Sequence, residues 1–143
     1  MTEIKYIYFP YYDKEEDSLE VRVRNRIGED KGPLGNIAIN SNTNIIAFIP
    51  TNKSYGKKLI SSGGYEGDQY YTISAKYKEN IDLERKKEII RFEIEKIIAY
   101  ILADASAKLG LCMYRHENPN LALLLDNINY DSIIENIEHP WDD

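Results

Sequence analysis

Residues 82–109 limit what this chain can fold into more than any other stretch, because they contain neither glycine nor proline. Asp82 is a typical N-cap residue, Lys108 lies near the other end, and Gly110 follows, so both ends of one long helix are marked. Apolar residues recur at spacings of three and four from Ile90 onward, which predicts an amphipathic helix. The rest of the fold must therefore offer a surface that this helix covers.

The second half of the predicted helix, residues 97–109, is apolar on nearly every side. Ala99, Ala103 and Ala107 recur every fourth residue, a spacing that allows a second helix to approach closely. We therefore expect a homodimer or a higher oligomer that forms through residues 97–109. The alternative is that short helices from the chain's own C-terminal part cover this half.

Residues 1–77 have mainly β-strand patterns. The clearest is at residues 18–26, where Leu19, Val21 and Val23 alternate with charged residues. The stretches at 28–35 and 50–67 are rich in glycine and are predicted to be loops. Strands are predicted at residues 4–11, 18–26, 36–40, 44–49 and 69–77, which form two antiparallel hairpins and one further strand.

These elements predict an α+β fold in which an antiparallel sheet of about five strands is covered by one long helix and one or two short helices. The short helices are expected within residues 118–138, with Asp131 as a helix cap, before an acidic tail at residues 139–143. A chain of 143 residues is the size of one domain, so we expect residues 1–143 to form a single domain.

The composition argues against several kinds of site. One cysteine and two histidines do not suffice for a disulfide framework or a zinc site, and we expect neither a metal nor a cofactor. The glycines of residues 50–67 do not have the spacing of a phosphate-binding loop or of a dinucleotide fingerprint. No apolar run is long enough to cross a bilayer, and the N-terminus does not resemble a signal peptide, so a cytoplasmic protein without membrane contact is expected.

The negative charge is unevenly distributed. The net charge is −6, yet residues 126–143 contain six acidic side chains and no Lys or Arg, so the first 125 residues are neutral overall. Such a segment can steer a partner with a basic surface. Our first hypothesis is a non-catalytic protein of the inhibitor, immunity or anti-defence type, which binds a macromolecule stoichiometrically. The predicted docking residues are Asp126, Asp131, Glu135, Glu138, Trp141, Asp142 and Asp143.

A second hypothesis is a nucleotide-binding or single-stranded nucleic-acid-binding protein. Arg22, Arg24 and Arg26 lie on one face of the strand at 18–26, about 7 Å apart, and can follow phosphates. Tyr6, Tyr8 and, in the glycine-rich loop, Tyr65 are candidates for stacking on bases. The alternative is an ordinary solvated sheet face with paired charges.

Asp104 is the one carboxylate in the apolar half of the long helix. A partly buried carboxylate needs a partner, and Arg115, His116 and Lys108 are the candidates. Asp104 with Arg115 and His116 would suit a binding or enzymatic site, but no nucleophile or second acid is identified. Pairing with Lys108 one turn away would be purely structural. We therefore expect no catalytic residues.

Overall fold

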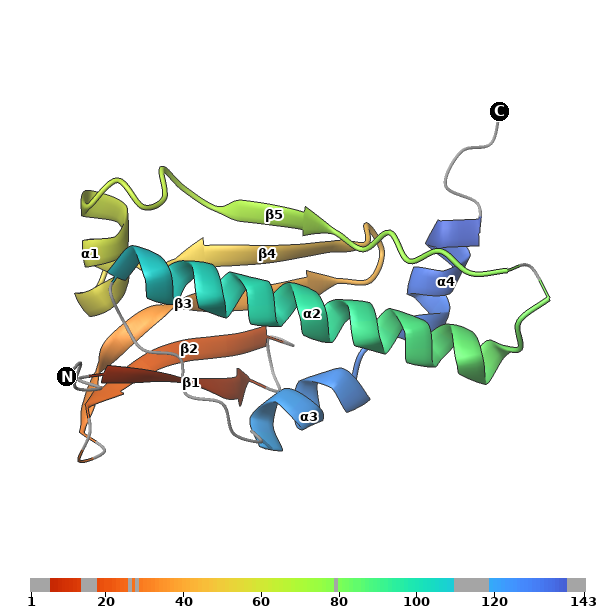
Figure 1. The fold of residues 1–143 in the computed structure, drawn as a ribbon, viewed down its shortest axis with the longest axis horizontal. Helices are drawn as coiled ribbons and strands as arrows, with labels where there is room; N and C mark the ends of the chain where they lie inside the picture. Colours follow the sequence, from red (N-terminus) through yellow and green to blue (C-terminus); the bar gives the residue numbers. More distant parts are fainter. Residues whose placement is uncertain are drawn as a thin grey trace.

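A computed structural model describes residues 6–13, 18–25, 27, 29–78, 80–109 and 119–138. Its sheet is antiparallel, and the strands lie side by side in chain order (Figure 1). The strands are β1 (Tyr6–Asp13), β2 (Ser18–Asn25), β3 (Asp30–Asn40), β4 (Ile45–Pro50) and β5 (Gln69–Thr72). The predicted α+β class, with a sheet of five antiparallel strands, is confirmed.

The described residues also form four helices. The long helix α2 (Leu83–Leu109) crosses one face of it, as predicted (Figure 1). Helix α1 (Ser54–Ser61) lies at one end of the sheet, and α4 (Tyr130–Glu138) lies at the other end beside the turn between β3 and β4. Helix α3 (Pro119–Asp126) lies close to β1 and β2. None of the described helices is long and apolar enough to span a bilayer.

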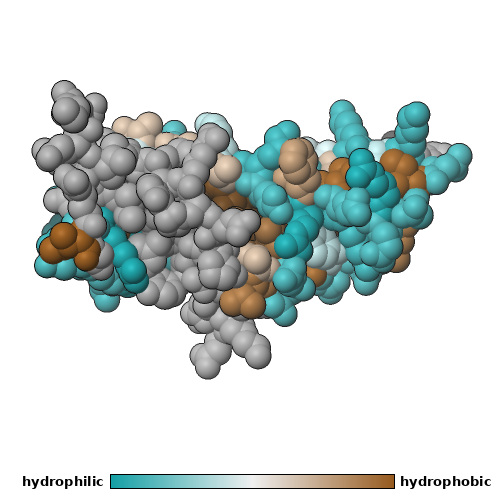
Figure 2. Space-filling model, turned by 60° about the horizontal axis from the view of Figure 1, so that its bottom comes forward, coloured by the Kyte–Doolittle hydropathy of each residue, from teal (hydrophilic) through white to brown (hydrophobic). Residues whose placement is uncertain are grey.

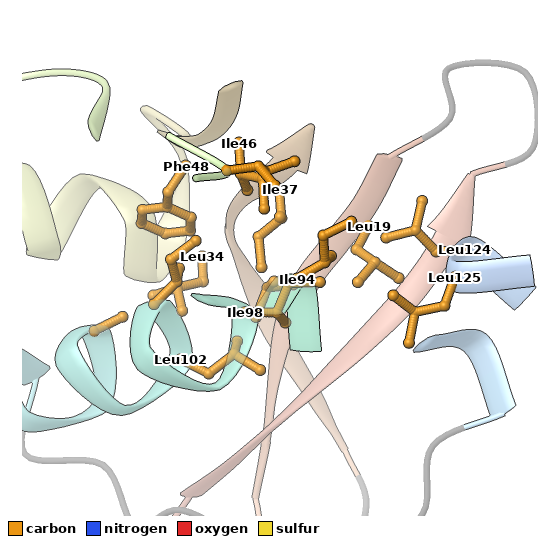
Figure 3. Packing of buried hydrophobic residues seen from close by; sticks show 14 of the residues in the cluster. Leu19, Leu34, Ile37, Ile46, Phe48, Ile94, Ile98, Leu102, Leu124 and Leu125 are labelled. Atoms are coloured by element: carbon orange, nitrogen blue, oxygen red, sulfur yellow. The ribbon is translucent and has the colours of Figure 1, made fainter. Parts of the chain in front are cut away.

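The core lies between α2 and the sheet. Ile94 and Ile98 of α2 face side chains of β3 and β4, among them Ile37 and Ile46 (Figure 3), and Leu102 of α2 is also buried. Burying one such side chain contributes about 1.5–3 kcal/mol. At the other end of the cluster, Leu124 and Leu125 of α3 approach Leu19 of β2. The predicted stripe of α2 is buried at Ile90, Ile94, Ile98, Ile101 and Ala105.

The helix caps agree with the sequence at α2 but not at α4. Asp82 caps α2, because its carboxylate accepts a hydrogen bond of 2.8 Å from the amide of Arg85. The prediction that Asp131 caps the last helix is wrong. Asn129 accepts the hydrogen bond from the amide of Ser132 at 3.1 Å, and Asp131 lies inside the first turn. Asx residues two positions apart compete for the same role, and the backbone conformation selects one of them.

Strand β3 begins earlier than predicted, at Asp30 instead of residue 36. Its pairing with β2 shifts twice, so Leu34 and Lys31 are extra residues of two β-bulges. These bulges accommodate both Pro33 and Gly32. The φ of Gly32 is +118°, a conformation that suits glycine. The predicted loop at residues 28–35 is therefore largely strand, because bulges remove the conflict between these residues and a regular ladder.

Helix α1 lies inside residues 50–67, which were predicted to be irregular. Its sequence contains Gly56 and two lysines, and no side chain makes a cap hydrogen bond at its N-terminus. Leu59 is fully buried in the core cluster, and Gly56 is also buried. This short helix is therefore stabilised by tertiary packing, as helices of this length usually are.

Strand β5 ends at Thr72, whereas a strand to residue 77 was predicted. Thr72 pairs with Ile45, the first residue of β4, so β4 offers no further partner beyond this point. The chain continues beyond β5 without helix or strand, and exposed and half-buried residues alternate from residue 74 to residue 78. This extension packs along α2 instead of along a strand.

Candidate functional site

Asp104 contacts Tyr65, another of the predicted site residues, and also Lys108. Its Oδ2 accepts a hydrogen bond of 2.5 Å from the hydroxyl of Tyr65 and lies 3.0 Å from the Nζ of Lys108. The predicted pair with Lys108 is therefore present. The contact with Tyr65 joins residues 39 positions apart, so no local pattern indicates it. Arg115 and His116 lie outside the described residues, and their proposed contact with Asp104 stays a prediction.

The protonation states of this pair follow from its surroundings. Burial works to raise the pKa of the Asp104 carboxyl, but the hydrogen bonds from Tyr65 and Lys108 outweigh it and lower the pKa below its usual value. Burial, together with the hydrogen bond to Asp104, raises the pKa of the Tyr65 hydroxyl well above that of an ordinary tyrosine. Near neutral pH, Asp104 is thus an ionised acceptor and Tyr65 a protonated donor, an arrangement that holds two elements together.

Aromatic rings surround this pair. Lys108 Nζ lies 3.8 Å from the centroid of the Tyr65 ring, which in turn packs edge-on against Phe48 at 5.5 Å. Tyr65 is only 3% exposed, so its ring belongs to the core and does not project from a loop as a stacking surface. Tyr71 and Tyr100 make a second edge-on contact, with centroids 5.8 Å apart. These two tyrosines were not among the predicted site residues, although the sequence has twelve Tyr against three Phe, and Tyr suits half-buried positions.

The arginine face of β2 is partly neutralised. The guanidinium of Arg22 donates to Asp30 Oδ2 at 2.6 Å and to Glu20 Oε1 at 2.7 Å, and these hydrogen bonds raise its pKa. Arg24 lies on the same strand face and is half-buried, whereas Arg26 is outside the described residues. A phosphate would have to compete with two carboxylates for Arg22. The nucleic-acid hypothesis stays a prediction.

The two tyrosines that were grouped with these arginines do not stand opposite them in the sheet. In the register of β1 with β2, Tyr6 pairs with Asn25 and Tyr8 pairs with Val23. The side chains of Tyr6 and Tyr8 are outside the described part of the structure.

Three of the predicted docking acids have described side chains. Asp126 makes an ion pair of 2.6 Å with Arg91 of α2, and Asp131 lies 3.8 Å from Lys87. The side chain of Asp131 is still 74% exposed, and Glu135, one turn further along α4, is exposed as well. The other predicted docking side chains, those of Glu138, Trp141, Asp142 and Asp143, lie outside the described residues.

The outer face of α2 carries apolar side chains where a surface helix usually carries charge. Phe92 is 62% exposed and Tyr100 is 59% exposed. Ala99 and Ala107 are exposed, and Ala103 is half-buried. In the view of Figure 2, hydrophobic side chains reach the surface in several places between hydrophilic ones. The exposed face of α2 is the one on which oligomerisation was predicted, and that prediction stays open.

Comparison with protein families, with curated proteins and with solved structures returns no match in any of the three. Within the described residues, no group of three or more His, Cys, Asp or Glu side chains converges as metal ligands do.

Proposed function

We propose that this chain is a cytoplasmic, non-catalytic protein that acts by stoichiometric association with a macromolecular partner, in the manner of an inhibitor, immunity or anti-defence protein. The partner carries a basic surface and docks on the acidic C-terminal segment. The observation that carries the proposal is the position of Asp131 and Glu135. These two carboxylates lie one turn apart on α4 and are exposed, within a segment that has no Lys or Arg.

The ion pairs of Asp126 and Asp131 with α2 indicate which of the acids can dock a partner. Asp126 is held by Arg91 in a close pair, so its charge is largely satisfied within the chain. Asp131 lies at 3.8 Å from Lys87 and is highly exposed, and a pair of this kind contributes little and leaves the carboxylate accessible. Asp131 and Glu135 are therefore the described acids best placed to meet a basic partner.

The experiment compares two doubly neutralised variants in an extract of the native host. Asp131→Asn with Glu135→Gln removes the exposed pair on α4, whereas Glu84→Gln with Glu88→Gln removes two exposed acids at the same spacing on α2. Bound proteins are identified by quantitative mass spectrometry, and the binding is then titrated with the purified partner. We expect a 1:1 complex whose affinity falls about tenfold or more in the α4 variant only, and which weakens with salt.

Equal affinities for the wild type and the α4 variant would show that this surface does not dock the partner. Equal losses in both variants would mean that only net charge matters, which also contradicts a defined docking surface.

A further inference from the structure

Strand β5 is an edge of the sheet with an open side. It pairs with β4 only, and in Figure 1 no other described element lies beyond it. Tyr70 is 66% exposed and Thr72 is exposed. An open edge presents unpaired backbone groups, which are a template for another strand.

The hydrogen-bonding pattern between β4 and β5 shows which backbone groups of β5 are unpaired. The amide of Ile73 donates to the carbonyl of Asn44 at 2.7 Å, which continues the register of the two strands. Hydrogen-bonded pairs alternate along an antiparallel ladder, so the amides and carbonyls of Gln69 and Tyr71 also face β4. Those of Tyr70 and Thr72 face outward, and no hydrogen bond from them to another described residue is found.

Ser74 supports this assignment independently. Its amide belongs to the same outward series, and it donates to the carboxylate of Glu93 at 2.8 Å, not to a strand. Glu93 thus accepts from the outward amide of Ser74, so the unpaired part of this sheet edge consists of Tyr70 and Thr72.

The charges along this edge are self-complementary. Glu66 and Asp68 precede β5, and Lys76 and Lys78 follow it, and all four side chains are exposed. When two copies of this segment run antiparallel, the acidic end of each lies beside the basic end of the other. A parallel arrangement would place like charges together.

We propose that β5 pairs with β5 of a second copy of this chain, antiparallel and about a two-fold axis at Tyr71. Tyr70 of each copy then faces Thr72 of the other, which forms four backbone hydrogen bonds and joins the two sheets into one. Glu66 stands opposite Lys76 of the second copy in this register. The contact is isologous, so it closes with two copies.

This axis also brings the α2 helices together, because α2 runs alongside β5 and its extension. The contacts are Lys86 with Tyr77, Glu93 with Ser74 and Tyr100 with Tyr71. Seven residues of α2 rise about 10.5 Å and three extended residues span about 10 Å, so these contacts recur at matching distances along α2 and along β5 with its extension. The exposed ring of Tyr100 lies near the axis and is covered by the second copy.

The first test uses charge reversal in the full chain, read out by size-exclusion chromatography with light scattering. The Glu66→Lys/Asp68→Lys variant has only basic residues at the four flanking positions, and the Lys76→Glu/Lys78→Glu variant has only acidic ones. We expect the wild type to be a dimer and each variant alone to be a monomer at the same concentration. An equimolar mixture of the two variants should form a 1:1 heterodimer.

The second test removes one outward amide. Thr72→Pro deletes an N–H that does not contact β4, and proline is tolerated at such edge positions. Thr72→Val keeps the N–H and the β-branched shape and is the matched control. We expect Thr72→Pro to be a folded monomer with a thermal unfolding midpoint close to that of the control, and Thr72→Val to be a dimer.

A wild-type chain that is monomeric at high concentration would overturn the proposal. So would a dimer that forms equally in Thr72→Pro and Thr72→Val, since that dimer would use another surface, such as α2 alone. Neither outcome bears on the acidic docking surface of α4, because that proposal concerns a different partner and different residues.

Discussion

Tyr65 shows how one side chain can join parts of the chain that are distant in sequence. It follows α1, its ring packs against Phe48 of β4, and its hydroxyl binds Asp104 of α2. A buried aromatic ring with a polar tip suits such a position, because the ring adds to the core while the hydroxyl finds a charged acceptor. The pair thereby fixes the connection between α1 and β5 against the long helix.

The Asp104 pair makes stability depend on acid pH. The pKa of Asp104 is lower in the folded chain than its ordinary value, which is about 3.9. Its contribution is therefore fully present above about pH 5 and is lost as the pH falls through the folded pKa. We expect the wild type to be more stable than Asp104→Asn by about 1–2 kcal/mol at pH 7, and this difference to shrink towards pH 2.5.

Urea unfolding at a series of pH values measures this difference. Glu88→Gln is a matched control, because Glu88 also accepts from a cationic side chain one turn away, that of Arg85 at 2.9 Å, but on the exposed surface. The control should track the wild type. A constant difference between wild type and Asp104→Asn across the whole range would contradict the assignment.

At the scale of elements, α1 is a helix that its own sequence does not favour. Gly56 lies within it and is buried, and a Cβ there would lie 2.2 Å from the carbonyl oxygen of Thr51 and 2.6 Å from that of Leu34. The helix thus approaches the strands through a residue without a side chain. The glycine that weakens α1 as an isolated helix permits its packing.

The close approach of Gly56 reverses the usual effect of replacing glycine with alanine in a helix. Propensity alone would make Gly56→Ala stabilising by about 1 kcal/mol. The clash with two backbone carbonyls should instead destabilise the protein by about 1–3 kcal/mol. Thermal and urea unfolding measure the change. Gly67→Ala is the control, since no atom of the described residues lies within 4 Å of a Cβ at Gly67, and a stabilised Gly56→Ala would refute the packing argument.

At the scale of the whole molecule, α4 ties the C-terminal part of the chain to the turn between β3 and β4. Asn136 Nδ2 donates to the carbonyls of Ser41 and Asn42 at 3.0 and 2.8 Å. Ser132 Oγ donates to the carbonyl of Ser41 at 3.2 Å, and Asn44 Nδ2 donates to the carbonyl of Ile133 at 3.4 Å. The turn is therefore held by a helix almost a hundred residues away in sequence.

Removing the amide of Asn136 should loosen this end of the molecule. We expect Asn136→Ala to lower the free energy of unfolding by about 1–2 kcal/mol, because the carbonyl of Asn42 loses its side-chain donor and that of Ser41 keeps only Ser132. Amide hydrogen exchange in the turn should quicken in the same variant. Glu135→Ala, a change at the neighbouring exposed position, should leave both quantities nearly unchanged. Equal exchange in the two variants would show that α4 does not hold the turn.

Features that depend on neighbours within one or two turns could be predicted from the amino-acid sequence. The core face of β2, with Leu19, Val21 and Val23, follows from strict alternation. The start of α2 at Asp82 and its buried stripe follow from capping and from a 3.6-residue period. The ion pair of Asp104 with Lys108 belongs to the same class, because the two residues lie one turn apart.

Features that depend on distant partners could not be predicted in this way, because they arise from packing in the folded chain. Helix α1 forms because Gly56 and Leu59 pack against the strands, and β5 ends because β4 offers no partner beyond Ile45. The hydrogen bond from Tyr65 to Asp104 joins residues 39 positions apart, and the hydrogen bond from Asn136 to the turn joins residues more than 90 positions apart. Local sequence patterns indicate which conformation a segment favours. Packing in the folded chain determines which distant side chains come into contact, and the candidate sites consist of such contacts.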